Sequence, residues 1–79
     1  MTEAGAVKAE MVEAMKRRFV GDTRDQSELF GIMSVAVSEV LADMIFAAAT
    51  SEEHGKTLMA ICQMYVETRW KALAKREAA

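Results

Sequence analysis

Residues 29–50, LFGIMSVAVSEVLADMIFAAAT, decide the fold because they predict one long helix that is apolar on almost every side. Glu39 and Asp43 are its only charged residues, and no lysine or arginine occurs between Arg24 and Lys56. A surface helix of a small monomer needs only one apolar stripe toward its core. Because two short neighbouring helices cannot easily cover so much apolar surface, we expect this helix to form the buried centre of an oligomer.

The same stretch is long enough to cross a lipid bilayer, so a membrane-spanning helix is an alternative. Glu39 and Asp43 oppose it, because a charge near the middle of a membrane helix costs about 2.5–3.5 kcal/mol on insertion scales. The stretch is also flanked by the acidic residues Glu28, Glu52 and Glu53 rather than by lysine or arginine. We therefore expect a soluble protein without a membrane partner.

Composition restricts the class of protein. The 79 residues have room for one domain, and the net charge of −2 argues against nucleic-acid binding, whose usual signature is positive charge. Cys62 is the only cysteine, which excludes an internal disulfide and is typical of a reducing, cytoplasmic location. The sequence contains no zinc signature, glycine-rich phosphate loop or nucleophile elbow. We expect no metal, no cofactor and no enzymatic activity.

Three helices fit the sequence, over residues 3–20, 25–49 and 52–77, and together they predict a single all-α domain over residues 1–79. The absence of proline and of long alternating β-branched runs supports helices throughout. The first helix carries apolar residues at spacings of three and four: Ala4, Val7, Met11, Met15 and Phe19.

The expected helix ends follow from capping residues. Gly21 is the expected C-cap of the first helix, because glycine readily adopts the left-handed conformation found there. Thr23 could begin the second helix through a capping box with Gln26, and Asp25 and Ser27 are alternative caps. The sequence Thr-Ser-Glu-Glu at residues 50–53 predicts a tight turn into the third helix.

The second and third helices are each about 37 Å long, whereas a compact chain of this length is only about 30 Å across. We therefore expect a long antiparallel hairpin with the short first helix packed on it, and two chains that dimerise into a helical bundle. The expected dimer core combines an a/d seam on the second helix with the apolar face of the third: Phe30, Met33, Val37, Val40, Met44, Leu58, Cys62, Val66, Trp70 and Leu73. Small residues flank the seam and allow a close helix crossing: Gly31, Ser34, Ser38, Ala42 and Ala49.

Charge is distributed unevenly between the two long helices. Residues 25–55 carry six acidic residues and no lysine or arginine, whereas residues 56–79 carry five basic and two acidic residues. We interpret this asymmetry as structural, because complementary charges help to set the register of paired helices.

The far side of the second helix is the candidate functional surface, because it mixes apolar and acidic side chains. We predict that it binds a protein with basic residues around an apolar centre, through Ile32, Val35, Glu39, Asp43 and Phe46, flanked by Met64. An ordinary solvated face is the alternative, and a metal or acid–base role for the two carboxylates is a weaker one. Small, acidic, cofactor-free helical proteins of this kind are typically adaptors, antitoxins or phage-type inhibitors of a host protein, an analogy at the level of class.

Two further hypotheses use the same residues differently. The chain could be a purely structural self-assembling module whose far face binds another copy. It could instead be a small enzyme or ligand-binding protein formed at a dimer interface, with Glu39, Asp43 and Arg69 converging from two chains. Arg69 lies within the apolar face of the third helix, so it needs an acidic partner there or anchors an anionic ligand.

Overall fold

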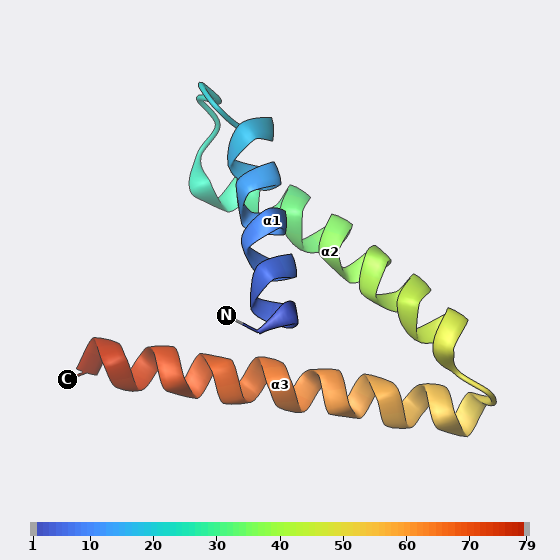
Figure 1. The fold of residues 1–79 in the computed structure, drawn as a ribbon. Coiled ribbons are helices and arrows are strands. Elements are labelled where there is room, and N and C mark those ends of the chain that lie inside the picture. Colours follow the sequence, from blue (N-terminus) through green and yellow to red (C-terminus); the bar gives the residue numbers. More distant parts are fainter. Residues whose placement is uncertain (1, 79) are drawn as a thin grey trace. The chain divides into compact units, whose positions relative to one another are not determined.

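The protein, described over residues 2–78 by a computed structural model, consists of three α-helices, with no strand among these residues (Figure 1). Helix α1 spans Glu3–Arg18, α2 spans Gln26–Ala48 and α3 spans Glu52–Ala78. The predicted all-α class and the number of helices are therefore confirmed.

The chain divides into two units, Met1–Phe30 and Gly31–Ala79, which are treated separately below. The first contains α1 and the start of α2, and the second contains the rest of α2 and α3. The predictions of a single domain and of α1 packed on the hairpin concern both units, so they stay predictions.

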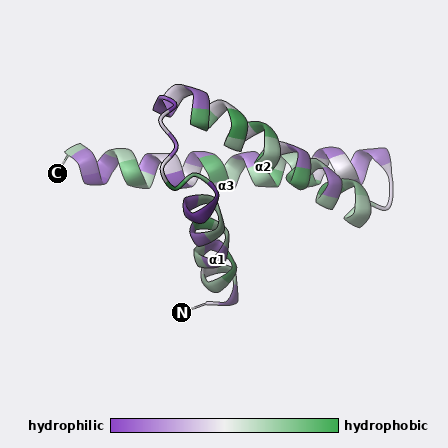
Figure 2. Ribbon diagram, turned by 90° about the horizontal axis from the view of Figure 1, so that it is seen from above, coloured by the Kyte–Doolittle hydropathy of each residue, from purple (hydrophilic) through white to green (hydrophobic). Residues whose placement is uncertain are grey.

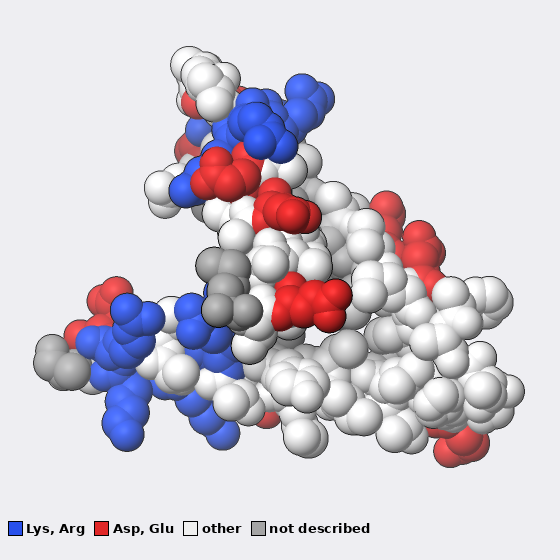
Figure 3. All heavy atoms as spheres, in the orientation of Figure 1, with Lys and Arg blue, Asp and Glu red and all other residues white. Residues whose placement is uncertain are grey.

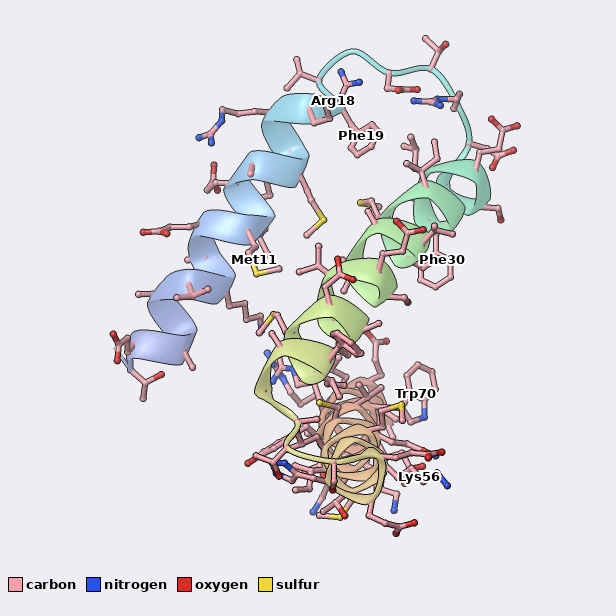
Figure 4. All side chains as sticks on the ribbon, turned by 90° about the vertical axis from the view of Figure 1, so that its right-hand side faces the viewer. Met11, Arg18, Phe19, Phe30, Lys56 and Trp70 are labelled. Carbon is pink, nitrogen blue, oxygen red and sulfur yellow. The ribbon has the colours of Figure 1, made fainter. Side chains whose placement is uncertain are left out.

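In the first unit, α1 ends two residues earlier than expected. Phe19 is its C-cap and donates its backbone N–H to the Met15 carbonyl over 3.2 Å. Gly21 lies beyond this cap with a φ of 75°, a left-handed conformation that favours glycine. Figure 4 shows the Phe19 ring turned toward the start of α2, while Phe30 points away from α1.

The link between α1 and α2 is held by Asp22. Its carboxylate accepts hydrogen bonds from the backbone N–H of Arg24 over 2.9 Å and from the Arg24 guanidinium over 2.7 Å. The guanidinium hydrogen bonds, with the backbone bond second, lower the pKa of Asp22 from 3.8 to about 2. The same guanidinium lies over the Phe19 ring at 5.9 Å, a cation–π distance.

Asp25 caps α2, because its Oδ1 accepts the backbone N–H of Glu28 over 2.9 Å. Of the three candidates from the sequence, Asp25 is therefore the cap, and Thr23 is not. An aspartate fits this position because it also places negative charge at the positive end of the helix dipole.

In the second unit, a short link at residues 49–51 joins α2 to α3, in the expected place. Ser51 Oγ accepts the backbone N–H of His54 over 3.1 Å and so caps α3. The ring of His54 reaches back, and its Nδ1 accepts the backbone N–H of Thr50 over 3.0 Å. The two bonds fix the direction in which α3 leaves the turn.

Helices α2 and α3 pack together, but only near this link. Leu41 and Ile45 of α2 and Ala49 of the link are half-buried along one side, and Leu58 and Cys62 of α3 are half-buried. Every residue of α3 from 63 to 78 is exposed, and Figure 1 shows the two helices spreading apart from the turn. The expected helix pair is thus present, with its contact confined to one end.

No residue among 2–78 is buried, although many apolar residues line the helices (Figure 2). In the second unit the residues beside the turn are at most half-buried. Most of the apolar surface of α2 therefore remains open to solvent. Dimerisation into a bundle would cover it and stays a prediction.

Two glycines allow a test of this local packing. A Cβ at Gly55 would lie 3.6 Å from the Ala49 Cβ, an ordinary van der Waals distance, so we expect Gly55→Ala to stabilise α3 by about 0.5–1 kcal/mol. Gly21→Ala should destabilise by about 1 kcal/mol because of its positive φ. The two variants should shift the midpoint of thermal unfolding in opposite directions, by about 4 °C or more for each kcal/mol. A loss of stability at Gly55→Ala would instead mean that another molecule occupies this space in solution.

Candidate protein-binding surface

The five candidate residues on α2 lie along one exposed side of that helix. Their spacings of three and four residues place them on a common face, turned away from the half-buried Leu41 and Ile45. Phe46 is 87 % exposed and Val35 58 %, the largest values among the apolar side chains of this face. We name this set, Ile32, Val35, Glu39, Asp43 and Phe46, the outer face of α2.

The outer face combines apolar side chains with uncompensated acidity. Glu39 and Asp43 are exposed, and neither forms an ion pair with any residue from 2 to 78. Because α2 and the following link contain no lysine or arginine, the nearest such residue along the chain is Arg24 for Glu39 and Lys56 for Asp43. The ion pairs of the described residues are local, such as Lys56 Nζ with Glu52 Oε1 at 3.8 Å.

Met64, the sixth candidate, does not join this face. It is 64 % exposed on α3, about 160° around the helix from Cys62, which faces α2. Its side chain is therefore turned away from α2, and the structure does not bring it together with Phe46 and its neighbours.

Most of the predicted dimer core is also exposed in the single chain. On the α2 seam, Phe30, Val37, Val40 and Met44 are exposed and Met33 is half-buried. On α3, the residues beyond Cys62 are exposed: Val66, Trp70 and Leu73. This exposure leaves them accessible to a second copy, and their role as a dimer core stays a prediction.

A shallow open groove beside the link is a feature that the sequence did not single out. It is lined mainly by apolar side chains of both helices: Ala42, Ile45, Phe46, Ala49, Gly55 and Met59, with Thr50, Ser51 and Glu52 at the link. The small residues Ala42, Ala49 and Gly55 create the hollow. In the sequence, the only signal for this groove was the presence of Ala42 and Ala49 among the small residues beside the expected seam. Phe46 connects the groove to the outer face of α2.

Within residues 2–78, the structure does not bring together the three residues of the predicted interface enzyme, Glu39, Asp43 and Arg69. Glu39 and Asp43 lie on the side of α2 turned away from α3, and Arg69 is exposed on the uncovered half of α3. Within residues 2–78, no group of three or more His, Cys, Asp or Glu side chains could hold a metal ion.

Helix α2, Gln26–Ala48, is long and apolar enough to cross a membrane by length and composition, and none of its most apolar window is buried. Core helices of soluble proteins, which are mostly buried, and signal sequences satisfy the same criteria. Glu39 and Asp43 lie inside this helix, so insertion would place two carboxylates in the bilayer.

Comparison with known proteins found no match: no family model, no curated protein and no solved structure matches this chain.

Proposed function

We propose that this chain is a non-catalytic, cytoplasmic protein-binding module, an adaptor or inhibitor, whose outer face of α2 binds another protein. The observation that carries the proposal is the exposure of Phe46, 87 % accessible at the end of a face that also carries Glu39 and Asp43. A large aromatic side chain left in water beside a groove is typical of a binding anchor. The flanking carboxylates would attract a partner with basic residues around an apolar centre.

The acidic pair should decide whether the partner is captured. We expect Glu39→Lys combined with Asp43→Lys to lower partner binding at least tenfold while leaving helicity unchanged, because both side chains are exposed. Immobilised wild-type and variant chains would be compared for retention of proteins from cell extract. The retained protein, identified by mass spectrometry and purified, would then be titrated against each chain.

Glu10→Lys with Glu13→Lys is the matched control, because it changes the net charge equally on exposed positions of α1. A photoreactive phenylalanine analogue at position 46 should cross-link the same partner. If the control lowers binding as much as the α2 variant does, general charge rather than the outer face is responsible. Recovery of the chain in the membrane fraction would overturn the proposal in favour of a membrane-inserted α2.

A further inference from the structure

The link between α2 and α3 is closed by a histidine that accepts a hydrogen bond from the backbone. The Nδ1 atom of His54 accepts the backbone N–H of Thr50 over 3.0 Å and lies 3.2 Å from Thr50 Oγ1. In return, His54 donates its own backbone N–H to Ser51 Oγ over 3.1 Å. The two bonds form a reciprocal pair related to the capping box, in which the third residue of a helix bonds back to the chain before it.

A histidine at this place differs from the glutamate or glutamine of an ordinary capping box. Its Nδ1 accepts only when the ring is neutral with the proton on Nε2, because both nitrogens of the charged ring are donors. A backbone N–H can only donate, so the bond from Thr50 requires the neutral ring. In the protonated ring, Nδ1–H and the Thr50 N–H would be two donors facing each other, and Thr50 would lose its partner.

The charged groups of α3 near the link lie to the sides of His54. Glu53 is about 100° around the helix from His54, and Glu52 is about 160° away. Lys56 lies on the side of Glu52, to which it is ion-paired at 3.8 Å. Figure 3 shows basic side chains gathered over the C-terminal part of α3, away from the link.

The environment of the ring therefore does not favour a positive charge through a direct partner. From α2, the last titratable residue before the link is Asp43, on the outer face turned away from α3. The ring also lies in the first turn of α3, where the positive end of the helix dipole opposes an added positive charge.

This hydrogen bond lies where the contact between α2 and α3 is concentrated. Ala49, Leu58 and Cys62 are half-buried around the link, whereas α3 is exposed from residue 63 onward. Thr50 and Ser51 themselves line the groove beside the link. A change in their hydrogen bonds therefore acts on the helix pair and on the groove together.

We propose that His54 is a pH-sensitive cap of the α2–α3 link. The neutral ring holds Thr50 and fixes the direction of α3, whereas the protonated ring releases Thr50 and loosens the contact between the two helices. The contribution of the bond is present at about pH 7.5 and is lost as the pH falls to about 5.5, a range in which histidine is the side chain that ordinarily changes charge. This device belongs to the second unit alone and does not depend on a partner at the outer face of α2.

The titration can be followed at a single residue, because His54 is the only histidine of the chain. Nuclear magnetic resonance of the ¹⁵N-labelled chain would record the ring nitrogens of His54 and the amide of Thr50 between about pH 7.5 and pH 5.5. At the upper end, the ring proton should be on Nε2. As the pH falls, the Thr50 amide should shift with the same midpoint as the ring, and its protection against hydrogen exchange, corrected for the intrinsic rate, should fall about fivefold, as expected for one hydrogen bond.

His54→Gln is the matched control, because its side-chain oxygen accepts a hydrogen bond without titrating. In this variant the Thr50 amide should stay constant over the range. Urea unfolding followed by circular dichroism should show the ratio of folded to unfolded chain falling about fivefold in the wild type on acidification, and remaining constant in His54→Gln. His54→Ala should resemble the acidified wild type at either pH.

Three results would overturn the proposal: a ring proton on Nδ1 at the upper end of the range, a Thr50 amide that does not follow the ring, or an equal pH response in His54→Gln. The first two come from the wild-type chain and hold even where a variant folds poorly. The purified chain alone is used, so failure here leaves the partner-binding proposal for α2 unaffected, and the reverse also holds.

Discussion

Ile45→Asp should separate α2 from α3 and lower the free energy of unfolding by about 2–4 kcal/mol. Ile45 is half-buried and lines the groove beside the link together with Met59 of α3, so the change removes apolar contact and places a charge among apolar side chains. Small domains are stable by only about 5–15 kcal/mol, and this chain has no buried residue among 2–78 to compensate. Urea unfolding followed by circular dichroism would measure the loss.

Phe46→Asp is the matched control, because it introduces the same charge at the neighbouring residue. Phe46 is 87 % exposed, so its replacement should change the free energy of unfolding by less than about 0.5 kcal/mol. Phe46, although larger than Ile45, would thus contribute less to the free energy of unfolding. Equal loss of stability in both variants would contradict the assignment of Ile45 to the helix contact.

Trp70→Glu should abolish self-association of the chain, raising the dimer dissociation constant at least a hundredfold. Truncation of a buried interface tryptophan typically costs about 2–4 kcal/mol, and a symmetric dimer loses two of them. The single chain should keep its helicity, since Trp70 is 70 % exposed there and supports no internal contact of similar size. Light scattering after size exclusion would report the mass over a dilution series.

Met64→Glu provides the comparison for that variant. It adds the same charge to an exposed position of α3, 64 % accessible, about 120° around the helix from Trp70. We expect it to leave the dimer mass unchanged. Dissociation by Met64→Glu but not by Trp70→Glu would place the contact on the opposite side of α3.

Local signals in the sequence were sufficient to find the helices. Gly21 and the polar residues of the two links interrupt the apolar periodicity, and the structure ends the helices within two residues of each predicted boundary. The cap of α2 was among the three residues considered, because only side chains such as that of Asp25 can accept an N-terminal backbone N–H. Such short-range hydrogen bonds depend on neighbours in the sequence.

The contacts between helices were less predictable from the sequence. Ile45 belonged to neither the expected seam nor the outer face, yet it lies in the α2–α3 contact. Because α2 is apolar on almost every side, its periodicity cannot select the side that meets α3. The place of Met64 beside the outer face depends in the same way on the crossing geometry of the two helices, which spacing along one helix does not contain.

No residue from 2 to 78 is buried, and this links the folded lifetime of the protein to its abundance. When the apolar surface of a chain is covered mainly by other molecules, each binding event adds RT ln(1 + [L]/Kd) to its stability, about 2.7 kcal/mol at a hundredfold excess over Kd. Chains without a bound partner would unfold more often and become substrates for proteolysis. Chains made in excess of their binding partners would then be degraded. The cellular level of this chain would therefore follow the level of the molecules that bind its apolar surface.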